Sequence, residues 1–306
     1  MKSTTVRRMT LSVAAVSVLS GAAACGPLGA SGASGGSGKD DGVSGGRATH
    51  ARSVAALRSA ERATHRADSA RVESVTTMGS MMSMKADGAM GWGDGLVGNL
   101  TITYTGGWVA DSMRGLGTTS MEARYLPDAY YAKMGEKFAE QAGGKHWIRY
   151  GYADLADFGG SSGAFLRDQM RNTTPNQSVK LLLASGDVEK VGTEKVRGEN
   201  TTHYAGTVDV ADLAAGNSGL DAGQLAGLKR QLTQAGVTTE TVHIWVDDRD
   251  LLVKKVEKGR MSVGEYTQTA YYSDYGVRVS AGKPPAGDTE DFTTLVRQQD
   301  RTGTTS

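Results

Sequence analysis

The chain of 306 residues contains one cysteine, five histidines and almost no excess of charge. The lone cysteine, Cys25, excludes a disulfide within the chain. Its 34 basic and 33 acidic residues give a net charge of +1, so no basic surface is predicted for nucleic acid or an anionic membrane. The histidines are scattered with no pair at ligand spacing, and Asp247–Asp250 lacks the glycine and terminal glutamate of a calcium loop. We therefore predict no metal site and no cofactor.

Long apolar runs are also missing, apart from one near the N-terminus. Met9–Ala24 is uncharged, but it is too short and alanine-rich for a spanning helix, which needs about 20 predominantly apolar residues. It follows Lys2, Arg7 and Arg8 and ends in small residues, which is the pattern of an export signal. We predict a lipoprotein-type signal peptide over residues 1–24. The arginine pair leaves both the general secretory and the twin-arginine routes open.

Cys25 directly follows the small residues Ala22, Ala23 and Ala24. This arrangement resembles a bacterial lipobox, in which the cysteine thiol receives a diacylglycerol and the signal is cut before it. It departs from the pattern at Ala22, where leucine is preferred. The alternative is an ordinary secreted protein with Cys25 as an unused thiol. We expect Cys25 to be a lipid anchor that holds the protein at the outer face of the cytoplasmic membrane.

The segment after Cys25 has a composition that cannot form a core. Residues 26–46 are almost entirely Gly, Ser, Ala and Asp, with Lys39 as the only lysine, which predicts a flexible coil. Residues 25–47 are thus expected to be the anchor cysteine and its linker. Residues 48–300 are long enough for one large domain with a substantial core.

Beyond the linker, the hydrophobic period alternates between helical and strand-like stretches. Helices are predicted over residues 49–70, 162–171, 176–185, 223–235 and 292–296. Strands are predicted over residues 75–85, 99–105, 129–134, 146–152, 188–198, 201–210, 239–246, 251–257 and 261–272. The pattern indicates one antiparallel, meander-like sheet of about ten strands, which must curl because twist accumulates. If the sheet does not close, helices must cover its apolar inner face.

Several short segments occur in an order known from one protein family. They are AYYAKM (129–134), GKHWI (144–148), the stretch Leu181–Val210, TVHIWVD (241–247), YSDYG (272–276) and Pro284-Pro285. Over about Val54–Val296 the chain resembles the LppX/LprAFG-type bacterial lipoproteins, which share the fold of the LolA-like lipoprotein carriers. This resemblance implies an α+β protein with a curved, unclosed antiparallel half-barrel, whose concave face is covered by helices and forms a cavity for acyl chains.

The resemblance also implies a carrier function. Members are thought to bind or carry lipids, glycolipids or lipidated proteins in the cavity. The expected partners are the membrane through acylated Cys25, a lipid or acylated ligand, and a membrane transporter or another envelope protein; no nucleic acid is expected, and the protein is expected to be a monomer.

Candidate cavity residues come from apolar positions that share a face. Methionine suits irregular apolar ligands because it is flexible and polarizable, although the same residues would also suit a filled core. Trp147 and Trp245 are candidates for the cavity mouth, where an indole bridges apolar and wet surroundings, and equally for plain packing on the sheet. The complete predicted lining is Met78, Met82, Met84, Leu100, Ile102, Tyr104, Phe165, Met170, Leu182 and Trp245.

Two other classes of function compete with the carrier. Gly159–Gly163 fits the G-x-S-x-G motif of hydrolases, but that motif needs a β-strand immediately before it, and the preceding ADLADF does not read as one. The possible partners His203 and His243 fall in the middle of predicted strands, so no catalytic residue is assigned and the protein is predicted not to be an enzyme. The remaining alternative is a lipoprotein that binds a protein partner or senses envelope state without lipid transfer, for example through exposed strand edges.

Overall fold

The computed structural model describes residues 43–158, 167, 174–214 and 220–303. The predicted signal peptide and the anchor Cys25 lie outside the described residues. So do the candidate cavity residues Phe165 and Met170 and the Gly159–Gly163 motif.

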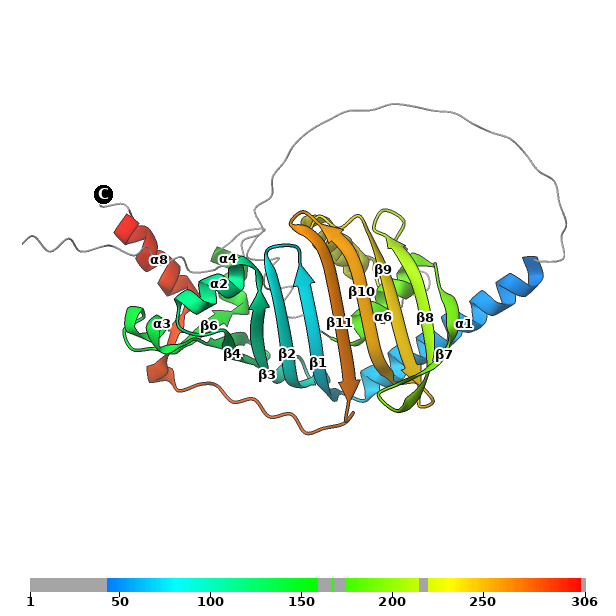
Figure 1. The fold of residues 1–306 in the computed structure, drawn as a ribbon, viewed down its shortest axis with the longest axis horizontal. Helices are drawn as coiled ribbons and strands as arrows, with labels where there is room; N and C mark the ends of the chain where they lie inside the picture. The colour runs from blue at the N-terminus through cyan, green and yellow to red at the C-terminus, as the bar shows by residue number, and fades with distance from the viewer. Residues whose placement is uncertain (1–42, 159–166, 168–173, 215–219, 304–306) are drawn as a thin grey trace, which may run out of the picture.

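One large sheet of 12 strands forms the body of the molecule (Figure 1). Its order is β12-β6-β5-β4-β3-β2-β1-β11-β10-β9-β8-β7, and each neighbouring pair is antiparallel except β12 and β6. The strands are β1 Ser69–Met78, β2 Met82–Gly91, β3 Val97–Gly106, β4 Ser120–Tyr125, β5 Ala129–Lys133, β6 Trp147–Gly151, β7 Glu189–Val196, β8 Glu199–Asp209, β9 Thr239–Asp247, β10 Leu252–Met261, β11 Gly264–Ser273 and β12 Thr289–Asp291. The end strands β12 and β7 do not pair with each other, so the predicted unclosed sheet is confirmed.

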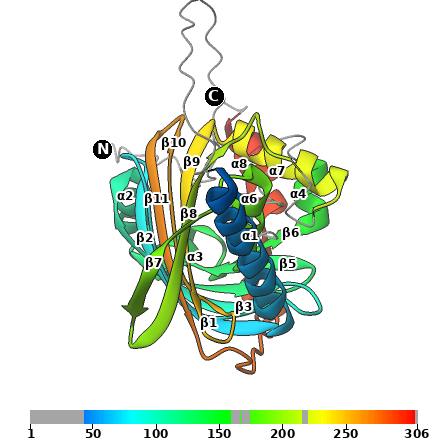
Figure 2. The same cartoon turned by 90° about the vertical axis from the view of Figure 1, so that its right-hand side faces the viewer.

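The helices lie at the concave side and at one end of this sheet. They are α1 Val43–Arg66, α2 Gly107–Gly115, α3 Glu136–Gln141, α4 Tyr152–Phe158, α6 Asn176–Ser185, α7 Ala222–Gln234 and α8 Phe292–Gly303, with a 3₁₀ turn at Ala286–Asp288. Figure 2 shows α1, α6 and α7 within the curve of the sheet. The α+β class and the helical cover of the concave face are therefore as the sequence predicts.

The main core lies between α6, α1 and the strands β8 to β10. Val179 and Leu182 of α6, Val242 and Ile244 of β9, and Leu57 of α1 are all fully buried. These side chains share the inward phase of their elements, which is what the sequence periodicity predicts. A buried polar contact also ties the layers together, since the Thr64 hydroxyl accepts the backbone N–H of Leu252 at 3.1 Å.

The sequence prediction was wrong where one strand was expected over residues 75–85. The structure has a hairpin there, with β1 ending at Met78 and β2 beginning at Met82. Gly79 adopts a φ of +47°, a conformation that favours glycine, and the Met81 N–H donates to the Met78 carbonyl at 2.9 Å. The alternation does not reveal this turn, because the hairpin register pairs Met78 with Met82 and directly paired residues lie on one face.

Candidate ligand-binding cavity

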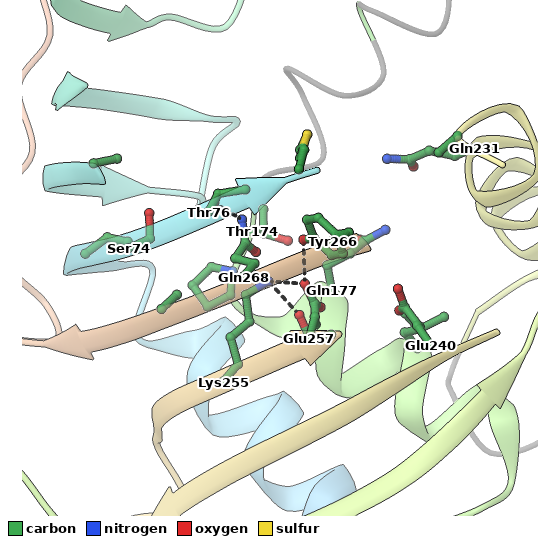
Figure 3. Close-up of a pocket in the computed structure, with 18 of the residues that line it drawn as sticks. Ser74, Thr76, Thr174, Gln177, Gln231, Glu240, Lys255, Glu257, Tyr266 and Gln268 are labelled. Carbon is green, nitrogen blue, oxygen red and sulfur yellow. Dashed lines mark hydrogen bonds and ion pairs between the residues drawn. The ribbon is translucent and has the colours of Figure 1, made fainter. Parts of the chain in front are cut away.

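A cavity of about 360 Å³ lies between the concave face of the sheet and helices α6 and α7. Figure 3 shows its wall from the side of the central strands. The apolar part of the wall comes from β1, β2, β3, β10, β11, α6, α7 and the α7–β9 connection. Its main members are Val72, Met78, Met84, Ala86, Met90, Leu100, Ile102, Leu181, Leu228, Leu232, Val237, Met261 and Ala270.

The register of the sheet explains why these side chains share one surface. Ala86 pairs with Ser74 on one side and with Ile102 on the other. Paired residues point to the same face, and every second residue returns to it. The three strands therefore present a continuous wall of mostly apolar side chains to the cavity.

Four of the ten predicted cavity residues line the cavity, namely Met78, Met84, Leu100 and Ile102. Met82 and Tyr104 instead pack around Met113 of α2, beside the cavity. Leu182 is fully buried in the core, whereas its neighbours Ser178 and Leu181 reach the cavity.

The expected position of Trp245 at the cavity mouth is wrong. Trp245 stacks on His203, with ring centroids 4.1 Å apart and the planes at 10°, and Lys254 Nζ lies 4.0 Å from its ring centroid. Its neighbour Ile244 faces the core, so strand alternation places Trp245 on the opposite side of the sheet.

A buried ion pair forms part of the cavity wall. Lys255 Nζ donates to Ser178 Oγ at 2.8 Å and lies 3.1 Å from Glu257 Oε2, and the Tyr266 hydroxyl donates to the same carboxylate oxygen at 3.3 Å. Burial alone would raise the pKa of the Glu257 carboxyl, but the charge of Lys255 and the hydrogen bonds outweigh it and hold this pKa below its usual range. The positive charge of Lys255 and the negative charge of Glu257 therefore cancel each other.

Glu240, the second residue of β9, is the third charged group of the wall. Its side chain is drawn toward the cavity in Figure 3, and only 5 % of the residue is exposed. Within the part of the chain that the structure describes, its carboxyl has no hydrogen bond or ion pair. Burial, followed by repulsion from Glu257, raises the pKa of Glu240 to about 8.

The sequence pattern did not reveal the buried pair Lys255–Glu257, because a bulge reverses the phase of β10. The pairing with β9 shifts between Leu252 and Lys254. In a regular strand, alternation from the buried Leu252 would place the side chains of Lys254 and Val256 in the cavity. The shift instead places the side chains of Lys255 and Glu257 in the cavity.

Two histidines that are distant in the sequence lie side by side in the structure. His203 Nε2 lies 2.9 Å from His243 Nδ1, because β8 and β9 are adjacent strands, although the sequence separates the residues by 40 positions. Burial lowers the pKa of both rings. Among the described residues, no three His, Cys, Asp or Glu side chains cluster in a way that could hold a metal ion.

Two further observations bear on the other expectations. The residues before Gly159 form helix α4, so the strand that a G-x-S-x-G nucleophile requires is not in place. In the described segments, no helix is both long and apolar enough to cross a membrane.

These features define an α+β protein with an unclosed sheet, helices on its concave face, and a mainly apolar cavity between them.

No known protein-family model matches the chain. The chain is 53% identical over 317 residues to "Putative lipoprotein SCO4650" of Streptomyces coelicolor, covering 98% of this chain and 99% of that protein. It is also 58% identical over 246 residues to a 31.2 kDa protein from the rplA-rplJ intergenic region of Streptomyces griseus, covering 80% of this chain and 81% of the relative. The chain belongs to the family of these Streptomyces proteins.

Two solved structures are similar in fold at low sequence identity. Lipoprotein LppX of Mycobacterium tuberculosis has a TM-score of 0.48 and 15% identity, covering 76% of this chain and 99% of LppX. LprF of Mycobacterium bovis has a TM-score of 0.47 and 15% identity, covering 77% of this chain and 98% of LprF.

Proposed function

We propose that this protein is a membrane-anchored extracytoplasmic lipoprotein that binds or carries a lipid, a glycolipid or another acylated molecule. The cavity on the concave face is the observation that carries this proposal. Its volume of about 360 Å³ falls in the range of about 300–1,000 Å³ that is usual for small-molecule sites. Its relative in Streptomyces coelicolor bears the name of a lipoprotein, which supports the anchor at Cys25.

The chemistry of the wall fits an acyl chain. Met78, Met84 and Met90 bring flexible thioether side chains to the surface formed by β1 and β2, and methionine adapts its shape to irregular apolar ligands. Binding would be driven by burial of apolar surface, at about 25 cal/mol per Å². A partner-binding or sensing lipoprotein, the alternative, does not need such a cavity.

Native mass spectrometry of the full chain carrying Cys25→Ser tests this function, because the substitution removes the expected covalent acyl groups and leaves only bound lipid. We expect one co-purifying lipid per chain. Ala86→Leu and Ala270→Leu, which add bulk inside the cavity, should lower that occupancy severalfold. Val75→Leu, on the exposed side of β1, is the matched control and should keep it. A bare mass together with no uptake of added lipid would overturn the proposal in favour of partner binding.

A further inference from the structure

Glu240 is an unusual residue for an apolar cavity. A carboxyl group that is taken out of water without a partner is strongly disfavoured. Yet Glu240 is 5 % exposed, lines the cavity, and has no hydrogen bond or ion pair to another described residue. Its carboxyl group is open to the cavity, where a bound molecule can reach it.

The charge balance of the wall points to the kind of partner. The charged residues lining the cavity in the described part of the chain are Glu240, Lys255 and Glu257. Lys255 and Glu257 neutralise each other at 3.1 Å, so an ionised Glu240 leaves the cavity with a net charge of −1. A ligand with one positive charge would cancel it.

The other groups around Glu240 do not supply this charge. Helix α7 contributes Gln231 and Leu232 to the wall, and α6 contributes Gln177 and Ser178. Strand β11 contributes the hydroxyl of Tyr266, which already donates to Glu257. When Glu240 is ionised, an anionic head group would meet two carboxylates and one lysine that is already paired, so it would be repelled.

Building on the proposed function, we propose that the cavity binds an amphiphile whose polar end is a protonated primary amine, with the amine donating to the Glu240 carboxylate. The apolar tail then lies along the wall formed by Met84, Leu100 and Ile102. Ammonium–carboxylate hydrogen bonds are about twice as strong as neutral ones, and the low polarity of the surroundings strengthens them.

The titration of Glu240 supports this assignment and makes it testable. Burial and Glu257 raise the pKa of the empty site to about 8, so at lower pH the carboxyl must lose its proton before it can pair with an ammonium group. The affinity for an amine therefore rises from pH 6 to pH 8. The other titratable groups that face this carboxyl are Lys255, Glu257 and Tyr266, and the internally paired Lys255 and Glu257 do not reverse this direction.

The test compares three probes with the same tail, dodecylamine, dodecanol and dodecanoate, on the full Cys25→Ser chain. Displacement of the neutral fluorescent probe N-phenylnaphthylamine reports their relative affinities. At pH 8 we expect dodecylamine to bind about tenfold or more tightly than dodecanol, and dodecanoate to bind weakest. Only the amine should gain affinity, by about tenfold or more, between pH 6 and pH 8.

Glu240→Gln removes the charge while it keeps the shape of the side chain. This variant should lose the preference for the amine and its pH dependence, while its affinity for dodecanol stays the same. Glu199→Gln, at an exposed glutamate at the start of β8, is the matched control and should behave like the parent chain. If all three probes bind equally, or if Glu240→Gln keeps the preference, the amine assignment is wrong while the apolar-ligand function stands. If none of them displaces the fluorescent probe, both proposals fail.

Discussion

At the scale of single residues, Glu240 should reduce the stability of the empty protein. Its native pKa of about 8 lies above the ordinary value of 4.5, so the native state keeps the proton at a pH where the unfolded chain has already lost it. The unfolded state then binds fewer protons, and stability falls as pH rises through this window. Each unit of pKa difference corresponds to about 1.4 kcal/mol.

We therefore expect Glu240→Gln to raise the free energy of unfolding by roughly 2 kcal/mol or more at pH 8 and to change it little at pH 4.5. Thermal denaturation at both pH values measures the effect, with about 2–4 °C expected per kcal/mol for a domain of this size. Glu199→Gln should shift neither midpoint. An equal gain at both pH values would show that the native carboxyl is not destabilised by its surroundings.

The residue scale also marks where sequence reasoning stops. The phase of an alternating pattern predicted that Met84, Leu100 and Ile102 share an inward face, and the register confirmed it. Glu240 is in phase with the buried Val242 and Ile244 of β9, so alternation does place it on the inward face, although a carboxyl group is not expected in an apolar cavity. For Glu257, only the bulge in β10 reveals the inward position.

At the scale of elements, the join between α6 and β8 depends on a glycine. A Cβ at Gly206 would collide with the Asp187 carbonyl oxygen and lie 2.8 Å from Leu182 Cδ1. The Asp187 carboxylate in turn accepts the backbone N–H of Thr207 at 2.8 Å. The segment after α6 is thus held against β8 only because Gly206 has no side chain.

Gly206→Ala should therefore lower the free energy of unfolding by about 1–3 kcal/mol, the usual cost of overpacking. Gly192→Ala in the neighbouring strand β7 is the matched control, since no atom lies within 4 Å of the added Cβ. Its effect should stay within about 0.5 kcal/mol. Chemical denaturation of both variants decides the matter, and an equal effect of the two would contradict close packing at Gly206.

Helices and strands were predicted best where residues next to their ends, such as proline or glycine, determine where they begin and end. Helix α6 begins directly after Pro175 and ends before Gly186, which has a φ of +71°, and its predicted bounds match the structure. The hairpin at Gly79 and the parallel pairing of β12 with β6 were missed. The hydrophobic period reveals neither feature. The hairpin keeps alternate residues on the same face, so the alternation continues through it. The β12–β6 pairing joins segments that are 142 positions apart in the sequence.

At the scale of the whole molecule, the proposed function needs both a cavity that holds the ligand and a linker that connects this cavity to the membrane anchor. The sheet and its helices provide the cavity. The predicted linker of residues 25–47 is too long at its end, because helix α1 already begins at Val43; the part before α1 would allow the domain to move while Cys25 stays in the membrane. Two acyl signals hold a protein to a bilayer far more firmly than one. A lipid-anchored cavity is therefore well placed to exchange a ligand with the membrane.

The anchor yields a prediction for the intact cell. The wild-type chain should be found in the membrane fraction and should lose residues 1–24, with Cys25 carrying the mass of a diacylglycerol. Cys25→Ser should remove that mass and shift the chain out of the acylated membrane pool, while Ser31→Ala in the linker should change neither. Fractionation followed by mass spectrometry of the N-terminal peptide measures both. A wild-type peptide with an unmodified Cys25 would leave the cavity without its anchor, and the protein would then have to meet its ligand as a freely diffusing binder.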